Sequence, residues 1–180
     1  IGAIMGAAGV PFDLYRTFGI ERRFGFSTIT LKLWLADFLK ATLISAILSG
    51  ILLAALFGLI GAATKTWWLW MWIFYAGFQL LMTVLYPLVI APLFNKFEPL
   101  DDPLITGGVM SLMDKAGLKA KGVYRVDALK RSRHSNAYFT GLGRSRRIVL
   151  FDSLLSSHAP DEILAVLAHE IGHWKKGHIR

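Results

Sequence analysis

Charged and apolar positions divide the chain into three stretches. Residues 41–63 contain no charged side chain, residues 67–94 form a second uncharged run, and Lys65 lies in the short gap between them. Each run is long enough to cross the hydrocarbon core of a bilayer, which takes about 20 residues of helix. The pattern therefore predicts a transmembrane helical hairpin over residues 41–94.

The ends of the second run carry interfacial and helix-breaking residues. It opens with a tryptophan cluster: Trp67, Trp68, Trp70 and Trp72. Tryptophans bunched at one end of a span are typical of the membrane–water interface. Near the other end, Pro87 and Pro92 predict a kink or an end of the helix, because proline lacks the N–H that the helix ladder needs.

The first 40 residues read as the end of a membrane helix followed by a cytoplasmic loop. Ile1–Val10 is apolar but too short to span, and residues 11–40 are polar and mixed. Gly19 and Gly25 predict turns, and residues 32–40 predict the start of the helix that enters the bilayer. Because the chain starts at Ile1 and stops at Arg180, we expect it to be an internal piece of a longer protein.

Residues 95–180 have the composition of a soluble domain. The pattern predicts a helix from Asp101 to Ala116 with a stop at Gly117, a short helix over 152–157 and a last helix over 160–176. It also predicts strands over 122–129, 136–142 and 147–151, the last two forming a hairpin through 143–146. The expected fold class is a mainly α membrane protein: a transmembrane hairpin followed by a small, incomplete α+β subdomain of the zincin type, in which the last helix packs on a short antiparallel sheet.

Composition narrows the function classes. The chain is 54% apolar, carries a net charge of +8 and has no cysteine. The missing cysteines exclude disulfides, cysteine-ligated zinc and thiol catalysis. No nucleic-acid-binding motif accompanies the positive charge, so we expect the lipid bilayer rather than nucleic acid as its partner. We interpret the basic group as a solvated surface attracted to anionic headgroups: Lys130, Arg131, Arg133, Arg144, Arg146 and Arg147.

The distribution of basic residues predicts the sidedness of the hairpin. Residues 11–40 contain five Lys and Arg and residues 94–180 contain fourteen, whereas the turn of the hairpin contains only Lys65. The positive-inside rule therefore places both flanks on the cytoplasmic side. We expect a multi-pass integral membrane protein, and favour the bacterial inner membrane over the endoplasmic reticulum.

The last helix carries the pattern H-E-x-x-H in His169, Glu170 and His173. Residues four apart lie on one face of a helix, so two imidazoles can hold one metal ion. Glu170 projects to the side and can act as a general base on water without being a ligand. The ordinary alternative is two histidines on a packed helix face that happen to flank a glutamate.

The remaining histidines do not complete a known ligand set. His158 and Glu162 lie too far along the helix axis, and His178 faces the opposite side. His134 precedes a strand in no recognised ligand spacing, but geometry does not exclude it. We interpret His134, His158 and His178 as ordinary surface histidines.

Four segments together resemble the type I CAAX prenyl endopeptidases, which are membrane-integral zinc proteases. They begin at Ala91 (APLFNKFEPL), His134 (HSNAYFTG), Ile148 (IVLFD) and Leu164 (LAVLAHEIGHWKK). Proteases of the HtpX type are more distant relatives. The metal motif is widely shared, whereas the other three segments are more specific.

The resemblance implies a zinc metalloendopeptidase acting at the cytoplasmic membrane face. His169 and His173 would be zinc ligands and Glu170 the general base. The strand that carries Asn136, Ala137 and Tyr138 would be an edge strand that binds the peptide substrate. The family's third ligand, a Glu on a later helix, is not among the 180 residues, so we expect this piece alone to be inactive. The alternatives are an HtpX-like quality-control protease and a non-catalytic membrane scaffold.

Overall fold

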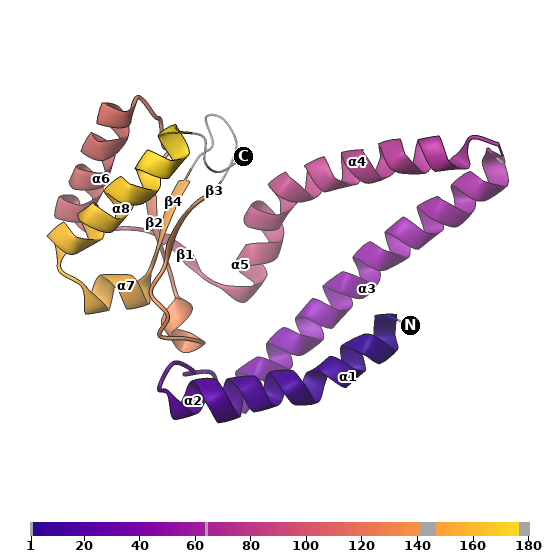
Figure 1. Cartoon of the computed structure of the whole chain (residues 1–180), viewed down its shortest axis with the longest axis horizontal. Helices are drawn as coiled ribbons and strands as arrows, with labels where there is room; N and C mark the ends of the chain where they lie inside the picture. Colours follow the sequence, from indigo (N-terminus) through magenta and orange to yellow (C-terminus); the bar gives the residue numbers. More distant parts are fainter. Residues whose placement is uncertain (1, 64, 141–146, 177–180) are drawn as a thin grey trace. The chain divides into compact units, whose positions relative to one another are not determined.

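The computed structural model describes residues 2–63, 65–140 and 147–176 (Figure 1). The described residues belong to two compact units: residues 30–94 form one, and residues 1–29 together with 95–180 form the other. The predicted turn at 143–146, together with Gly177 and His178, lies outside the described residues.

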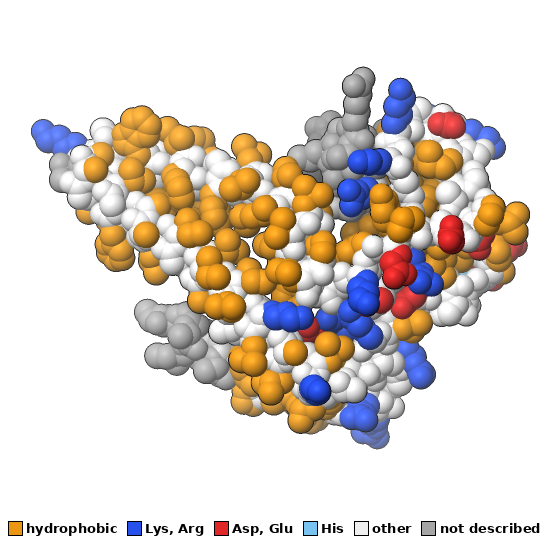
Figure 2. All heavy atoms as spheres, turned by 180° about the vertical axis from the view of Figure 1, so that it is seen from behind, with side chains coloured by type: hydrophobic (Ala, Val, Ile, Leu, Met, Phe, Trp, Pro, Cys, Tyr) orange, Lys and Arg blue, Asp and Glu red, His pale blue; other side chains and the backbone are white. Residues whose placement is uncertain are grey.

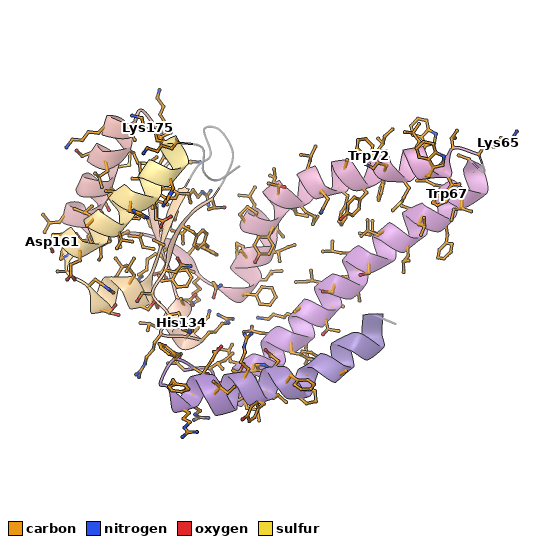
Figure 3. The ribbon with its side chains drawn as sticks, viewed as in Figure 1. Lys65, Trp67, Trp72, His134, Asp161 and Lys175 are labelled. Carbon is orange, nitrogen blue, oxygen red and sulfur yellow. The ribbon has the colours of Figure 1, made fainter. Side chains whose placement is uncertain are left out.

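The unit of residues 30–94 is the predicted helical hairpin. Its helices are α3 (Leu31–Ala62), α4 (Trp67–Leu85), a π-helical turn (Tyr86–Ile90) and α5 (Ala91–Phe94). The stretches Leu31–Ala62 and Trp67–Phe94 have mean hydropathies of 2.6 and 1.8 and bury none of the residues tested inside the structure. Hydrophobic side chains cover the visible surface of the hairpin (Figure 2), while Lys65 and Trp67 lie at its turn (Figure 3). The hairpin prediction is confirmed.

Individual residues explain where the first helix of the hairpin begins and where the second departs from α-helical geometry. Thr30 caps α3, because its Oγ1 accepts a hydrogen bond from Leu33 N at 3.3 Å. Pro87 lies in the π-helical turn that follows α4. This is the deviation from α-helical geometry that a missing proline N–H favours. Lys40 Nζ donates to Leu93 O at 3.1 Å, which links the start of α3 to the end of α5.

The second unit begins with α1 (Gly2–Leu14), a π-helical segment (Tyr15–Ile20) and α2 (Glu21–Arg23). The helical path therefore continues through Pro11 and Gly19, and the prediction of a turn at Gly19 is wrong. The five-residue spacing of the π-helical segment brings Arg16 Nε to 3.3 Å from Glu21 Oε1. Gly25 has a φ of 76°, so the turn predicted there is confirmed.

The remainder of this unit is a small α+β domain. Its strands are β1 (Phe97–Pro99), β2 (Val123–Val126), β3 (Ala137–Thr140) and β4 (Arg147–Phe151). Its helices are α6 (Pro103–Ala116), a 3₁₀ turn (Ala128–Lys130), α7 (Asp152–Ser157) and α8 (Pro160–Lys175). The predicted helices and the β3–β4 hairpin pairing are confirmed. Asp102 caps α6 through Leu104 N and Ile105 N, and Gly117 ends it at a φ of 70°.

The sheet has the strand order β1-β2-β4-β3. It is mixed rather than purely antiparallel, because β2 and β4 run parallel between two antiparallel pairs. A parallel neighbour needs a connection of a dozen or more residues. Residues 127–146 connect β2 to β4 and include β3, which lies on the side of β4 away from β2. The order of the strands along the chain does not by itself predict this order in the sheet.

The core lies between the sheet and the helices α6 and α8, which cover one face of it (Figure 1). Met113, Ile148, Leu150, Ile163 and Leu167 are its largest fully buried side chains. This core holds α8, which carries the candidate metal residues, in a fixed position on the sheet.

Candidate metal centre and substrate edge

Helix α8 is held at its start and along one face. Ala159 N donates to Glu162 Oε2 at 2.9 Å, which is the glutamate half of a capping box at the helix start. Ile163, Leu167 and Ile171 recur every four residues and are buried in the core. Because this stripe faces the sheet and α6, the orientation of the whole helix around its own axis is fixed.

The packing of α8 against α6 depends on Gly108. A methyl group built on Gly108 would lie 2.6 Å from Leu164 Cδ1 and 2.7 Å from Cδ2. Glycine at this position therefore lets the two helices approach closely, which explains a helix-disfavouring residue in the middle of α6. Its neighbour Gly107 has nothing within 4 Å of the same position.

His169 and His173 point their rings toward one another from adjacent turns of α8. Their Nε2 atoms lie 2.9 Å apart, and the rings are edge to face with centroids at 4.5 Å. His169 is exposed and His173 is half-buried, so the pair opens to the surface. One imidazole donates to the other in this arrangement, and the tautomers decide which.

The two nitrogens fit a shared zinc ion. In a tetrahedral site with Zn–N distances of about 2.0–2.1 Å, two ligand nitrogens stand about 3.3–3.4 Å apart. The observed separation of 2.9 Å is within about half an ångström of that. Among the described residues, no group of three or more His, Cys, Asp or Glu side chains gathers at one point. The donors brought together here are therefore the two imidazoles.

Glu170 follows His169 and lies about 60° from His173 around the helix axis. It is half-buried, at the border between the buried stripe and the exposed histidines. A carboxylate in this position can accept a proton from a water molecule that lies beside the two imidazoles.

β3 is at one end of the sheet and pairs only with β4 among the described strands. Phe151 N donates to Asn136 O at 3.0 Å, so the backbone groups of Asn136 point toward β4. Since these groups alternate along a strand, the N–H and C=O of Ala137 and Phe139 point away from β4. The prediction that this segment is an edge strand is confirmed; its role in substrate binding stays a prediction.

The three residues predicted to bind substrate have different surroundings. Asn136 is exposed, and its Oδ1 accepts a hydrogen bond from Ala137 N at 2.8 Å. Ala137 packs against the core to which α8 contributes. Tyr138 points to the opposite face of the sheet, where its ring meets Phe151 edge to face at 6.1 Å. The side chain of Asn136 thus accepts a hydrogen bond from the Ala137 N–H, which points to the open edge of the sheet.

The structure gives His134 a contact that sequence reasoning missed. Its ring stacks on Phe26 with a centroid distance of 4.4 Å and an interplanar angle of 12°. The two residues are far apart in sequence, and no local pattern signals such a pair. His158 also has a partner, since its Nδ1 lies 2.8 Å from Ser157 Oγ.

Several members of the predicted basic group have protein partners. Lys130 Nζ lies 2.6 Å from Asp127 Oδ2, Arg131 Nη1 donates to Asn95 Oδ1 at 2.6 Å, and Arg147 lies over the ring of Tyr124. Arg144 and Arg146 lie outside the described residues. Attraction of this group to anionic lipid stays a prediction.

Two family models match the chain. One, described as the CAAX prenyl protease N-terminal region with five membrane helices, matches residues 1–96, and the peptidase family M48 model matches residues 99–180. The crystal structure of S. mikatae Ste24p is similar over 99% of this chain and 42% of that chain, with a TM-score of 0.89 and 40% sequence identity.

Curated relatives carry the same family name. CAAX prenyl protease 1 of Saccharomyces cerevisiae is 44% identical over 172 residues, which is 94% of this chain and 38% of the relative. The homologues of Arabidopsis thaliana and Homo sapiens are 40% and 30% identical, covering 94% of this chain and 40% and 44% of the relatives. The chain thus spans about two fifths of the length of the relatives it matches.

Proposed function

The chain belongs to the CAAX prenyl proteases of peptidase family M48, and we propose that it is the part of a membrane-integral zinc metalloendopeptidase that carries the HExxH helix. The observation that carries this proposal is the convergence of His169 Nε2 and His173 Nε2 to 2.9 Å on the exposed face of α8. Two imidazoles held at that separation supply two neutral nitrogen ligands to one ion.

His169 and His173 would hold the zinc ion. When bound, zinc supplies Lewis-acid polarisation of water and of the scissile carbonyl. Glu170 accepts the proton that water loses as it attacks the carbonyl carbon, and the same carboxylic acid can then donate a proton to the leaving amine. The buried stripe of α8 keeps these three side chains in register, so little reorganisation is needed at the moment of reaction.

The edge of β3 is the proposed docking line for the peptide substrate. An extended peptide can pair with the N–H and C=O groups of Ala137 and Phe139 that point away from β4. The Asn136 amide would then leave Ala137 N and become available to a carbonyl of the substrate. Because main-chain pairing depends little on side chains, this edge supports binding of peptides with varied sequences.

The relatives' name points to substrates with a prenylated cysteine near the carboxyl terminus. We place the catalytic residues on the cytoplasmic side, from the basic flanks of the hairpin. The relatives named above are all eukaryotic, so the endoplasmic reticulum is a better candidate than the bacterial inner membrane favoured by the sequence interpretation.

The test is cleavage by the purified full-length protein of a peptide that ends in a farnesylated CAAX motif. Hydrolysis should stop after zinc chelation and return on addition of zinc. The same peptide without the farnesyl group measures how far the lipid contributes to recognition. Cleavage that persists after complete zinc removal would refute the proposal, and equal cleavage of unprenylated, unfolded membrane proteins would favour a quality-control protease.

A further inference from the structure

The loop of residues 127–135, which connects β2 to β3, is anchored at its start by two aspartates. Asp127 Oδ1 accepts a hydrogen bond from Lys96 N at 2.7 Å, and Asp152 Oδ1 accepts one from Leu129 N at 2.8 Å. Asp127 and Asp152 directly follow the parallel strands β2 and β4, so both lie at the same edge of the sheet. We call residues 127–135 the junction loop.

The segment of residues 24–29, which directly precedes α3, pairs with the junction loop as a short antiparallel ladder. Thr28 N donates to Arg131 O at 3.1 Å, and Arg133 N donates to Phe26 O at 2.8 Å. These two bonds flank Ser27 and Ser132, which face each other as an isolated antiparallel bridge. We call residues 24–29 the pre-hairpin segment.

The ladder ends in the stack of Phe26 on His134, the second of which is labelled in Figure 3. The backbone of His134 is also fixed, since its O accepts from Ser153 Oγ at 2.9 Å and its N donates to Ser132 Oγ at 3.2 Å. Two residues further on, Asn136 O enters the β4 ladder. His134, held through its ring and its backbone, therefore lies two residues before the point where the chain joins β4.

We propose that Phe26 and His134 are positioning residues for the peptide substrate. Their stack holds the pre-hairpin segment against the junction loop and fixes the first residues of β3, so that Ala137 presents its outward N–H in the register that an added strand needs. This inference rests on the proposed function, in which the β3 edge binds the substrate. The imidazole of His134 acts through its flat ring, not by binding metal.

The stack matters because β3 is short. Only Ala137–Thr140 form the strand, so an added peptide can make few backbone hydrogen bonds with it. An aromatic pair contributes an amount that corresponds to about two- to tenfold in an equilibrium constant. Loss of the ring contact should therefore weaken peptide binding by about that factor while leaving the residues of α8 unaffected.

The first measurement compares Phe26→Ala and His134→Ala with wild type in the full-length protein. We expect KM for the farnesylated CAAX peptide to rise about two- to tenfold, with kcat within about twofold of wild type and zinc content unchanged. His134→Phe retains a flat ring and should restore wild-type KM. Phe24→Ala, which removes a more exposed ring two residues away in the pre-hairpin segment, is the matched control.

A cross-link provides the second measurement. Ser27 and Ser132 form a pair without hydrogen bonds between their own backbones, for which the Cα atoms lie about 4.5 Å apart, within the range of a disulfide. The 180 residues contain no other cysteine. Ser27→Cys with Ser132→Cys, added to Phe26→Ala, should lower KM toward wild type when oxidised and lose the rescue when reduced. The same cysteine pair in a protein that keeps Phe26 measures the effect of losing the Ser132 Oγ acceptor of His134 N.

Peptide affinity measured by fluorescence anisotropy in the Glu170→Gln background separates this inference from the proposed function, because it needs no turnover. Weaker binding in Phe26→Ala, rescued by the oxidised pair, supports the positioning role. Unchanged affinity in Phe26→Ala, or an oxidised pair that leaves affinity low, overturns it. A wild-type enzyme that binds the peptide but never cleaves it would count against the proposed function alone.

Discussion

At the scale of single residues, the chemistry of the candidate site depends on very local geometry. His169 and His173 meet because four positions advance a helix by little more than one turn, and the 2.9 Å between their Nε2 atoms follows from that spacing. Glu170 needs only to follow the first histidine. These three assignments could therefore be made from the sequence, although their roles in catalysis stay predictions.

We predict that Glu170→Gln in the full-length protein lowers kcat by about 10²–10⁴-fold while zinc remains bound, because the amide cannot accept the proton from water. Zinc content by atomic absorption and hydrolysis of the farnesylated peptide give the two readouts. Glu162→Gln is the matched control on the same helix, since its amide oxygen can still accept from Ala159 N. Normal turnover in Glu170→Gln would mean that another group is the base.

We predict that His173→Ala loses both zinc and activity, because it removes one of two converging nitrogens and leaves the other without a partner at the metal. The measurement is zinc stoichiometry after dialysis against a weak chelator. A His173→Ala protein that retains one equivalent of zinc would show that His173 is not a ligand.

At the scale of elements, the site depends on how α8 and β3 are presented. α8 lies close to α6 because Gly108 leaves room for Leu164. β3 lies at the edge because the chain passes beyond β4 before it returns. Each of these properties depends on two elements. Gly108 belongs to α6 but makes room for a side chain of α8, and β3 is an edge strand because β4 pairs with it on one side.

We predict opposite stability effects for two adjacent glycine substitutions in α6. Gly108→Ala should destabilise the protein by about 1–2 kcal/mol, because its methyl group would overlap the Leu164 side chain and make it move within the packed contact of α6 and α8. Gly107→Ala should stabilise it by about 0.5–1 kcal/mol, since alanine lowers the cost of helix formation at an exposed position. Thermal unfolding measures both, and equal effects would contradict the close helix approach.

We predict that Ala137→Pro reduces peptide turnover about tenfold or more, with zinc content and melting temperature near wild type. Proline removes an N–H that points to the open edge and donates to Asn136 Oδ1 rather than to β4, so the β4 ladder stays intact. Ala137→Ser keeps the N–H and serves as the control. Wild-type turnover in a folded, zinc-loaded Ala137→Pro protein would reduce β3 to a structural strand.

At the scale of the whole molecule, the charge distribution predicts which side of the membrane each part occupies. The hairpin turn carries Lys65 alone, whereas both flanks are rich in Lys and Arg. Lys65 and Arg133 are both exposed, so cysteines at these positions are open to a reagent that can reach their side of the membrane.

We predict that, in sealed vesicles with the cytoplasmic face outward, a membrane-impermeant maleimide labels Arg133→Cys but not Lys65→Cys. After detergent permeabilisation, both should be labelled, which controls for intrinsic reactivity. Because the chain has no native cysteine, each signal within these residues reports a single position. The reverse pattern would invert the topology and remove the proposed catalytic residues from the cytoplasmic side.

The sequence by itself determined the helical hairpin, most helix boundaries and the pairing of His169 with His173 on one face of α8. Each of these depends on properties that the chain carries along its own length: hydropathy summed over a span, a cap such as Asp102, a stop such as Gly117, and the four-residue spacing of two histidines.

Only the tertiary structure decided the mixed order of the sheet, the close approach of α6 and α8, and the anchoring of the junction loop. Thr28 and Leu129 are hydrogen-bonded across 101 positions, and Phe26 meets His134 over a similar separation. Such contacts form because packing of the core brings distant segments together, and the residues involved have no periodicity or composition that distinguishes them beforehand. From the sequence, His134 was therefore interpreted as a surface histidine. Its stacking on Phe26 depends on the pairing of the pre-hairpin segment with the junction loop, which the sequence does not predict.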